Sequence, residues 1–203
     1  MAGGVDGSAG GVTRYRTIVA DPPWQITMKM GAGGRRARAT EVPYSMLSIE
    51  DIAALGVGEL AAPEAHLYLW STRRLFREGD AARVARAWGF EPCGEIIWGL
   101  RNPGMGGWNG NGHEPVLVAS RGSLPFPKDR LPGGVEFWRQ PYANGKIHSA
   151  KPEAFLDLVE QVSPGPYLEI FARRARFGWD YAGDGSLGTV DIPGLRNPGE
   201  AAA

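Results

Sequence analysis

The chain has 203 residues, 43% hydrophobic and 22% charged, and its 22 basic and 22 acidic residues balance to a net charge of zero. These values are typical of one soluble globular domain with a sizeable core, and they exclude a general basic field that would attract nucleic acid. Since no membrane-length apolar run, signal peptide, disulfide framework or zinc-ligand spacing is visible, we expect a cytoplasmic protein that binds neither membrane nor metal.

The two ends of the chain differ in composition from its middle. Residues 1–12 are glycine-rich with few apolar side chains, and residues 189–203 contain two prolines and end in three alanines. Such segments bury too little apolar surface to pack against a domain. We therefore expect one domain at residues 13–188 between two flexible tails.

The first strand is predicted at Ile18 to Ala20, a short apolar run of the kind that is buried in a parallel sheet. It ends at Asp21-Pro22-Pro23-Trp24. Proline has no N–H for a sheet ladder and holds the preceding residue extended, so the strand stops here. In open α/β sheets this carboxyl end is the place where ligands bind.

The residues at this strand end are hydrogen-bond acceptors beside an indole ring. The Asp21 carboxylate and the carbonyl groups of Pro22 and Pro23 suit an amine with two hydrogens, and Trp24 could stack on the flat ring that carries the amine. The same pattern also fits a strand that simply stops at two prolines beside a half-buried tryptophan.

The segment after Trp24, residues 25–42, has no hydrophobic periodicity. It combines three glycines with four cations, which are Lys29, Arg35, Arg36 and Arg38. Flexible cationic loops next to an active strand often clamp a substrate, and arginine suits phosphate groups, so we expect a nucleic-acid contact here. A solvated surface loop is the alternative.

Strands and helices then alternate along the chain. Ser48 is the predicted N-cap of a short helix, because Glu50 and Asp51 follow in the first turn, where acids are favoured. Further strands are expected at 66–70, 95–98, 116–118 and 166–171, a further strand or turn at 178–184, and helices at 73–88 and from Pro152 to 162. This alternation predicts a parallel α/β sheet with right-handed crossovers.

The loop from residue 100 to 112 and the position after it carry groups that can hold an unpaired base. Trp108 supplies a stacking surface, and Asn109 and His113 supply hydrogen-bonding groups among glycines. The alternative is a tryptophan packed against the core with polar turn residues around it. Residues 121–147, with four prolines, are expected to be irregular.

The strand-end motif also carries a resemblance to a known family. D-P-P-W after an apolar strand resembles the active-site motif of the MT-A family of adenine-N6 methyltransferases. Further segments follow in the family's order: Y-S-M-L-S-I-E-D-I-A-A-L at 44–55, H-L-Y-L-W-S-T at 66–72, W-G-F-E-P-C-G-E-I-I-W at 88–98, H-S-A-K-P at 148–152 and S-P-G-P-Y-L-E-I-F-A-R at 163–173. The resemblance implies a Rossmann-like methyltransferase fold, a mostly parallel sheet with helices on both faces, permuted so that the catalytic strand comes first.

The resemblance also implies a chemistry. Asp21 and Pro22, with Pro23 and Trp24 completing the motif, would hold the N6 amine so that its lone pair faces a methyl group, and Tyr44 would help Trp24 to stack the base. The methyl donor would be S-adenosylmethionine, so no metal is required. Catalysis is then mainly positioning and charge complementarity.

The cofactor site follows from the same resemblance. The residues implied around S-adenosylmethionine are Asp21, Lys151, Glu169, Phe171, Arg173, Gly183 and Asp184. Lys151 would pair with the cofactor's carboxylate. Relatives usually carry asparagine followed by glutamate or glutamine in the glycine turn, whereas this chain has Asp184 followed by glycine. Asp184 can accept from ribose hydroxyls, but it lacks the amide donor.

Three functions remain open at this point. We expect an S-adenosylmethionine-dependent DNA adenine-N6 methyltransferase, because the chain is compact and carries no added RNA-binding module. The second function is the same chemistry on RNA. The third is a non-catalytic nucleic-acid-binding subunit, against which the intact D-P-P-W motif argues. The residues assign neither a target sequence nor an oligomeric state.

Overall fold

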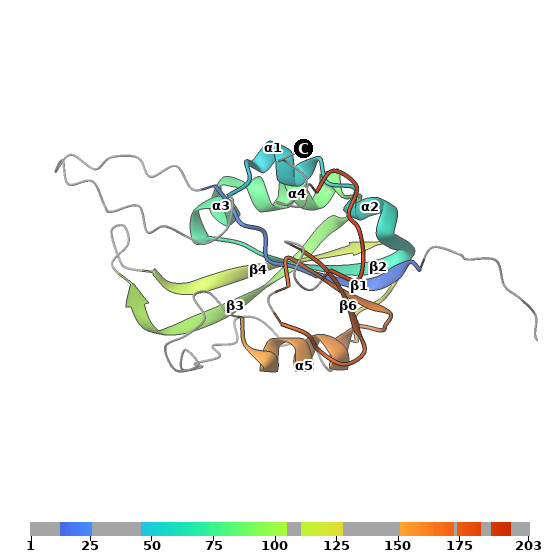
Figure 1. Ribbon diagram of the computed structural model, residues 1–203. Coiled ribbons are helices and arrows are strands. Elements are labelled where there is room, and N and C mark those ends of the chain that lie inside the picture. The colour runs from blue at the N-terminus through green and yellow to red at the C-terminus, as the bar shows by residue number, and fades with distance from the viewer. Residues whose placement is uncertain are drawn as a thin grey trace, which may run out of the picture.

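The computed structural model describes residues 13–25, 46–104, 111–127, 151–172, 174–183 and 188–195. Its centre is a six-stranded sheet in the order β3-β4-β2-β1-β5-β6 (Figure 1). The strands are β1 (Tyr15–Ala20), β2 (Ala61–Trp70), β3 (Glu91–Gly104), β4 (Asn111–Arg121), β5 (Tyr167–Ile170) and β6 (Trp179–Ala182). The helices are α1 (Ile49–Ala53), α2 (Val57–Leu60), α3 (Arg73–Glu78), α4 (Asp80–Ala87) and α5 (Glu153–Val162).

The expected α/β sheet with helices on both faces is confirmed, and most of its strand pairs are parallel. β1 pairs in parallel with β2 and β5, and β5 with β6. β4 is antiparallel to both β2 and β3. A parallel connection needs a crossover of a dozen or more residues, and only residues 105–110 separate β3 from β4. The strand that follows β3 must therefore run back along it.

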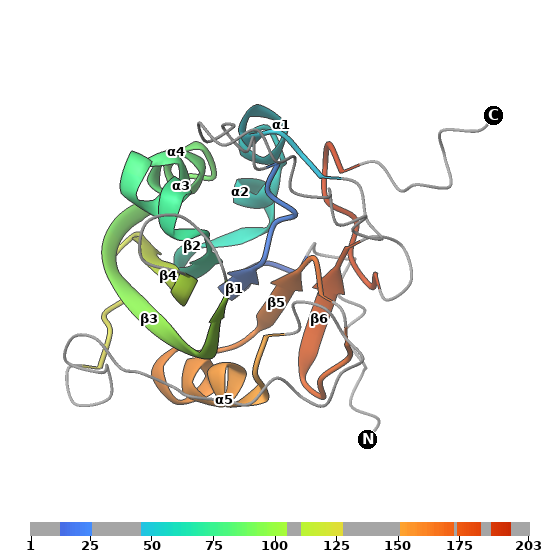
Figure 2. The same cartoon turned by 90° about the vertical axis from the view of Figure 1, so that its left-hand side faces the viewer.

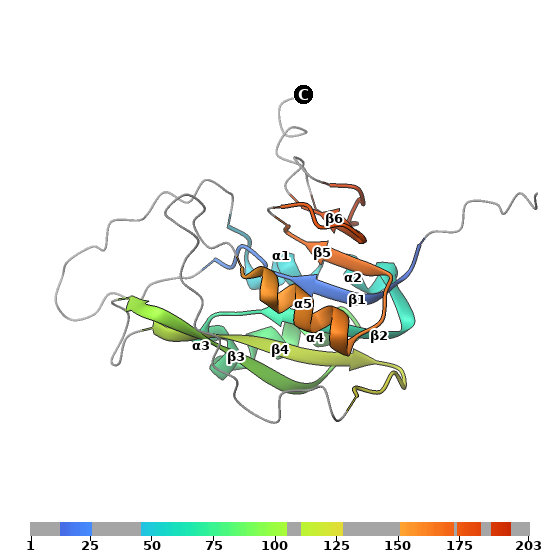
Figure 3. The ribbon, with the colours of Figure 1, turned by 90° about the horizontal axis from the view of Figure 1, so that it is seen from below.

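The β3–β4 hairpin is longer than the sequence pattern indicated. The residues at 100–104 and 111–112, expected in a loop, belong to strands. β4 pairs with β2 only from Val116 to Arg121, so the first residues of β4 pair with β3 alone. Figure 3 shows this part of the hairpin reaching past the rest of the sheet.

The central strand β1 is buried on both faces. In β1, Ile18 and Ala20 belong to one core with the helices α1 to α4, whereas Val19 belongs to a second core with Phe155 and Val159 of α5. Figures 1 and 2 show α1 to α4 on one face and α5 on the other. Successive strand residues point to opposite faces, so a single apolar run supplies both cores.

The helix expected at 73–88 is divided into α3 and α4. Gly79 adopts φ 85°, in the left-handed region, so it ends α3 and precedes α4. Thr72 caps α3 by accepting the Leu75 N–H, and Ser48 caps α1 by accepting the Asp51 N–H, as expected. In the described part of the chain, no helix has the length and apolar character that crossing a bilayer requires.

The expected boundary at residue 188 falls too early. Residues 189–195 return to α1 and α2, where Ile192 is only 5% exposed and the Gly56 N–H donates to the Pro193 carbonyl at 2.8 Å. Alternation of polar and apolar residues is too short here to predict a packed segment. Residues 1–12 and 196–203, the rest of the expected tails, lie outside the described residues.

Two glycines with positive φ provide a matched test of the turn after β4. Gly122 has φ 68°, and a Cβ added there would lie 2.5 Å from the Pro63 carbonyl oxygen, whereas Gly79 has nothing within 4 Å. Gly79→Ala should lower the free energy of unfolding by roughly 1–2 kcal/mol, the cost of a left-handed alanine. Gly122→Ala should lower it further, because a backbone clash is added. Urea denaturation of both variants measures the difference, and equal losses would contradict the close approach.

Candidate active site

The candidate site lies at the C-terminal end of β1, between the ends of β2 and β5. The chain crosses from β1 to β2 through helices on one face, and it enters β5 from α5 on the other face. Such a reversal opens a crevice at the carboxyl ends of the strands, which is where α/β proteins bind ligands. The Asp21 N–H donates to the Ile170 carbonyl at 3.3 Å, so Asp21 prolongs the β1–β5 ladder by one residue.

The prolines after Asp21 are held by backbone hydrogen bonds. The Pro22 carbonyl accepts the Trp24 N–H at 2.8 Å, and the Pro23 carbonyl accepts the Leu47 N–H at 2.9 Å. These carbonyls, expected to be free, therefore each have one partner. A carbonyl oxygen has two lone pairs, so each can still accept a second hydrogen bond.

Trp24 lies in the core rather than on an open surface. Its indole N–H donates to the Trp70 carbonyl at 2.9 Å, and only 7% of its surface is exposed. The ring thus ties the end of β1 to the end of β2. Because so little of the ring is exposed, it offers scant area to a stacked base. We assign Trp24 to holding the motif in place, in contrast to the stacking expected from the sequence.

A lysine connects the strand-end aspartate to a carboxylate on β4. Lys151 Nζ donates to Glu114 Oε2 at 2.8 Å and lies 3.4 Å from Asp21 Oδ1. The same ammonium lies 4.7 Å from the centre of the Trp70 ring, in cation–π contact. These contacts come from the segment before α5, from β4 and from the ends of β1 and β2.

The electrostatics of this cluster keep Lys151 charged. Burial by itself lowers the pKa of Lys151, whose side chain is 17% exposed, but the carboxylates of Asp21 and Glu114 outweigh burial and raise that pKa above its ordinary value. A lysine with a raised pKa holds its proton at neutral pH, so Lys151 cannot serve as a general base. It was expected to pair with a ligand carboxylate, and an ammonium has three N–H donors, so one donor beyond those directed at Asp21 and Glu114 can serve that contact.

Sequence reasoning missed Glu114 and chose its neighbour His113. Glu114 lies two residues before Val116, which belongs to the core under α5, whereas His113 faces the other side of the sheet. There burial lowers the pKa of His113, and Arg73 at the start of α3 lowers it further. The structure therefore does not bring His113 to Asp21. A charged residue just before the apolar run of β4 was the available signal for Glu114.

Glu169 lies on β5 beside β1, as a second partly buried carboxyl group at this edge. Its Oε2 atom has no hydrogen-bond partner within the described ranges. Burial raises the pKa of Glu169 to about 7, Arg174 opposes the rise and Asp21 adds to it. An unpaired buried oxygen suits a hydroxyl donor such as a ribose, so Glu169 fits the nucleoside part of S-adenosylmethionine.

The ends of β5 and β6 meet in a tight backbone arrangement. Phe171 has φ 65°, which is unusual for a bulky residue, and its N–H donates to the Ala182 carbonyl. A Cβ on Gly183 would contact Phe171 Cα and the Ala172 backbone at 3.6 Å. Phe171 and Gly183 are thus brought together at the edge where the cofactor was expected.

The remaining expected site residues lie outside the described residues, so their roles stay predictions. They are Lys29, Arg35, Arg36, Arg38, Tyr44, Trp108, Asn109, Arg173 and Asp184.

Comparison with known proteins adds independent information. The family model described as MT-A70 matches residues 15–185. An N(6)-adenosine-methyltransferase MT-A70-like protein of Drosophila melanogaster is 29% identical over 170 residues, which are 79% of this chain and 24% of that protein. The N(6)-adenosine-methyltransferase catalytic subunit METTL3 of Homo sapiens is 28% identical over 169 residues, 79% of this chain and 26% of that protein.

A shorter relative matches over more of its own length. The Type II methyltransferase M.MunI of a Mycoplasma species is 27% identical over 184 residues, which are 82% of this chain and 76% of that protein. The chain thus spans about a quarter of the fly and human relatives and about three quarters of the bacterial one.

The pKa of Glu169 predicts a pH dependence of stability. The folded carboxyl group ionises near pH 7, against about 4.5 for an unperturbed glutamate, so its contribution to stability is full below pH 4.5 and is lost as pH rises through 7. Glu169→Gln stays neutral, so its stability relative to the wild type should be greater at pH 8 than at pH 5. Thermal unfolding at both pH values measures this.

The matched control is Glu64→Gln, at an exposed glutamate of β2. It removes a glutamate charge without involving a buried carboxyl group. If the stability difference from the wild type changed with pH in the same way for Glu169→Gln and for this control, the pKa of Glu169 would not be raised.

Proposed function

Because the chain belongs to the MT-A70 family, we propose that it transfers a methyl group from S-adenosylmethionine to the N6 amine of adenine in DNA. The observation that carries this proposal is the cluster of Asp21, Lys151 and Glu114 at the carboxyl end of β1. It combines a carboxylate that can accept the hydrogens of an amine with a cation that holds this carboxylate in place.

The chemistry that these residues must perform follows from the substrate. The lone pair of the adenine N6 amine is delocalised into the ring, so the amine is a poor nucleophile. Accepting its hydrogens, by Asp21 and by the second lone pair of the Pro22 carbonyl, favours a pyramidal nitrogen with a directed lone pair. S-adenosylmethionine, when bound, supplies the methyl group on a sulfonium that leaves as a neutral thioether.

The proton released from N6 needs an acceptor other than Lys151. Lys151 is already protonated, so Asp21 or Glu114 passes the proton towards solvent. Lys151 instead keeps two nearby carboxylates from repelling each other, and it directs its third N–H into the site. The carboxylate cluster therefore positions the amine and removes its proton.

The cofactor would be held at the neighbouring ends of β5 and β6. Glu169 would accept a ribose hydroxyl at its unpaired oxygen, and Phe171 and Gly183 lie beside each other at the same edge. Arg173 and Asp184 complete the expected set. The order β1, β5, β6 across the sheet would place the methyl donor beside Asp21.

Two alternative functions are methylation of RNA and binding of nucleic acid without catalysis. The Type II methyltransferase among the relatives supports DNA as the substrate, and the N(6)-adenosine-methyltransferases support RNA as the alternative. The intact motif from Asp21 to Trp24, with Asp21 held by Lys151, supports catalysis over a purely binding role.

The test supplies the protein with labelled S-adenosylmethionine and with unmodified DNA or RNA, followed by mass analysis of the released nucleosides. The expected product is N6-methyldeoxyadenosine. Methylation of RNA alone would replace the DNA assignment, and binding of nucleic acid without any methylation would make the chain a non-catalytic subunit.

Asp21→Asn tests the role of the strand-end carboxylate. The change preserves shape, but its amide group donates towards an amine that also donates. Turnover should fall on the order of 10²- to 10³-fold, by analogy with the loss of one transition-state hydrogen-bonding group. S-adenosylmethionine affinity, measured by calorimetry, should change little, because Glu169 and the end of β6 are untouched.

The matched control is Asp80→Asn, at the start of α4 on the opposite face of the sheet. It should leave turnover unchanged. Turnover of Asp21→Asn within threefold of the wild type would make Asp21 a strand-end carboxylate without a catalytic role, and joint loss of turnover and cofactor binding would make it a cofactor ligand.

A further inference from the structure

The position of Lys151 depends on the start of α5. Lys151 precedes Pro152, the N-cap of this helix, and a residue before proline is restricted to extended backbone. This restriction sets the local conformation of Lys151, but it does not fix the distance of its backbone from β1 and β4. A contact from another element is needed to do that.

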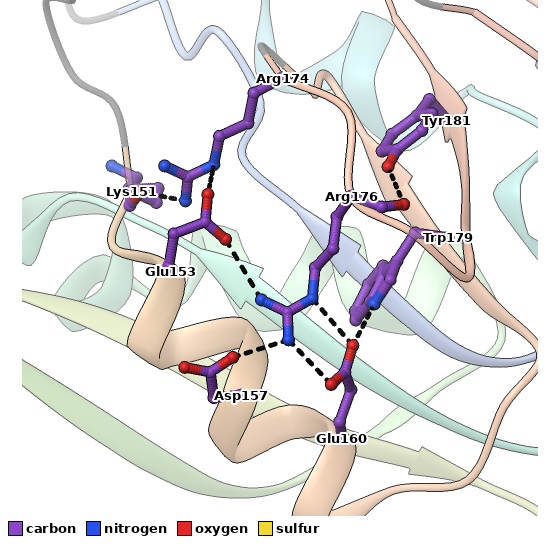
Figure 4. Close-up of polar contacts among 8 residues, drawn as sticks. All are labelled: Lys151, Glu153, Asp157, Glu160, Arg174, Arg176, Trp179 and Tyr181. Carbon is purple, nitrogen blue, oxygen red and sulfur yellow. Dashed lines mark hydrogen bonds and ion pairs between the residues drawn. The ribbon is translucent and has the colours of Figure 1, made fainter.

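Arg174, in the connection from β5 to β6, supplies such a contact. Its Nη2 donates to the Lys151 carbonyl at 2.6 Å, and its Nε pairs with Glu153 Oε1 at 2.9 Å (Figure 4). One planar guanidinium thus holds the carbonyl of Lys151 and the first turn of α5 together. Arginine suits this task, because its donors form a rigid fork.

A second arginine fixes the other oxygen of Glu153. Arg176 pairs with Glu153 Oε2 at 3.2 Å, with Asp157 Oδ1 at 2.6 Å and with Glu160 Oε2 at 2.8 Å (Figure 4). The three carboxylates lie on one face of α5, at spacings of four and three residues. The indole N–H of Trp179 also donates to Glu160 Oε1 at 2.7 Å, so β6 joins the same network.

These contacts differ from ordinary surface ion pairs. The difference lies in the arginine: the Arg176 side chain is only 18% exposed, whereas that of Arg83, in a surface pair, is 55% exposed. Two of the carboxylates that Arg176 binds, Glu153 and Asp157, are themselves 55% exposed. The backbone carbonyl of Arg176 also accepts the Tyr181 hydroxyl. Arg176 is therefore anchored through both its side chain and its backbone carbonyl. These contacts also fix the backbone near Arg174, two residues earlier.

We propose that Arg174 is a positioning residue for Lys151. By fixing the carbonyl from which Lys151 departs, it keeps the Lys151 ammonium between Asp21 and Glu114 and over the Trp70 ring. Arg176 supports Arg174 by holding Glu153. The effect of Arg174 on turnover rests on the proposed function, whereas its effect on the position of Lys151 does not.

The lysine content of the chain allows a direct measurement of that position. Only four lysines are present: Lys29, Lys128, Lys146 and Lys151. In protein labelled with ¹³C at the lysine ε carbon, the ε protons of Lys151 should be shifted upfield by the Trp70 ring beneath them. The signal is assigned by its absence in Lys151→Arg.

Arg174→Gln removes the guanidinium, so the Lys151 signal should move most of the way towards the value of free lysine. Arg174→Lys retains the charge but cannot hold the carbonyl and Glu153 with one fork, so it should restore part of the upfield shift. Glu153→Gln, which keeps the contact to the Lys151 carbonyl, should give a smaller displacement. Arg83→Gln is the matched control and should leave the signal unchanged.

Turnover is measured on the same variants. Arg174→Gln should lower it roughly tenfold to a hundredfold, because a displacement of about 1 Å at a reacting group can cost that much, and Arg174→Lys should recover part of it. An unmoved Lys151 signal in Arg174→Gln would overturn the proposal. A displaced signal with unchanged turnover would uphold the positioning role and instead remove Lys151 from the proposed chemistry.

Thermal unfolding separates positioning from general loss of structure. Arg176→Gln, which leaves three carboxylates on one face of α5, should lower the melting temperature more than Arg174→Gln does. If Arg174→Gln failed to fold, Arg174→Lys and Glu153→Gln would test the proposal instead. Displacement of the Lys151 signal from its wild-type position in these variants would support it, and an unchanged signal in both would refute it.

Discussion

The confinement of β1 is the constraint on which the site depends. This strand is paired along both edges, with β2 and β5, and covered on both faces, and Ile18 and Ala20 are fully buried. The strand is buried from Thr17 to Ala20, and at its C-terminal end exposure begins with Asp21. Whatever follows the strand is held by a rigid support, and here the residues that follow are an aspartate and two prolines. Trp24, bonded to the end of β2, completes that support.

Two partly buried carboxyl groups at this edge are stabilised in different ways. Asp21 is paired with the ammonium of Lys151, and the carboxylates of Asp21 and Glu114 together keep this lysine charged. Glu169 has no such ion pair in the described residues and retains a proton up to about pH 7. Both solutions follow from the cost of leaving a buried negative charge without compensation. The two groups therefore differ in chemistry. Asp21 is a charged hydrogen-bond acceptor, whereas Glu169 can lose its proton when a ligand donates a hydrogen bond to it.

The sequence predicted the parts of the structure that local chemistry determines. The buried first strand, its stop at Pro22 and the cap at Ser48 depend on neighbouring residues, and all three are present. The roles of Glu114 and Trp24 depend on pairings between distant strands. The register of β4 sends Glu114 towards α5, and the core between the sheet and the helices α1 to α4 encloses the Trp24 ring. Neither can be deduced from short-range periodicity.

The same limit applies to the partners of Lys151 and to the division of the helix expected at 73–88. The resemblance brought Lys151 to the site, but its partners come from β1 and β4, and its carbonyl contact comes from Arg174 after β5. The left-handed Gly79 divides one amphipathic pattern into two helices, because a glycine within such a pattern can either continue or end a helix.

The return of residues 188–195 to α1 and α2 has a consequence for synthesis of the protein. Leu55 and its neighbours on this face are synthesised well before Ile192, which covers the same core. At roughly 5–20 residues per second, the interval is on the order of ten seconds. During this time the nascent chain carries an apolar face without its final cover, the kind of surface that promotes aggregation. The last described segment thus closes the core, and the domain becomes complete only after this segment has been made.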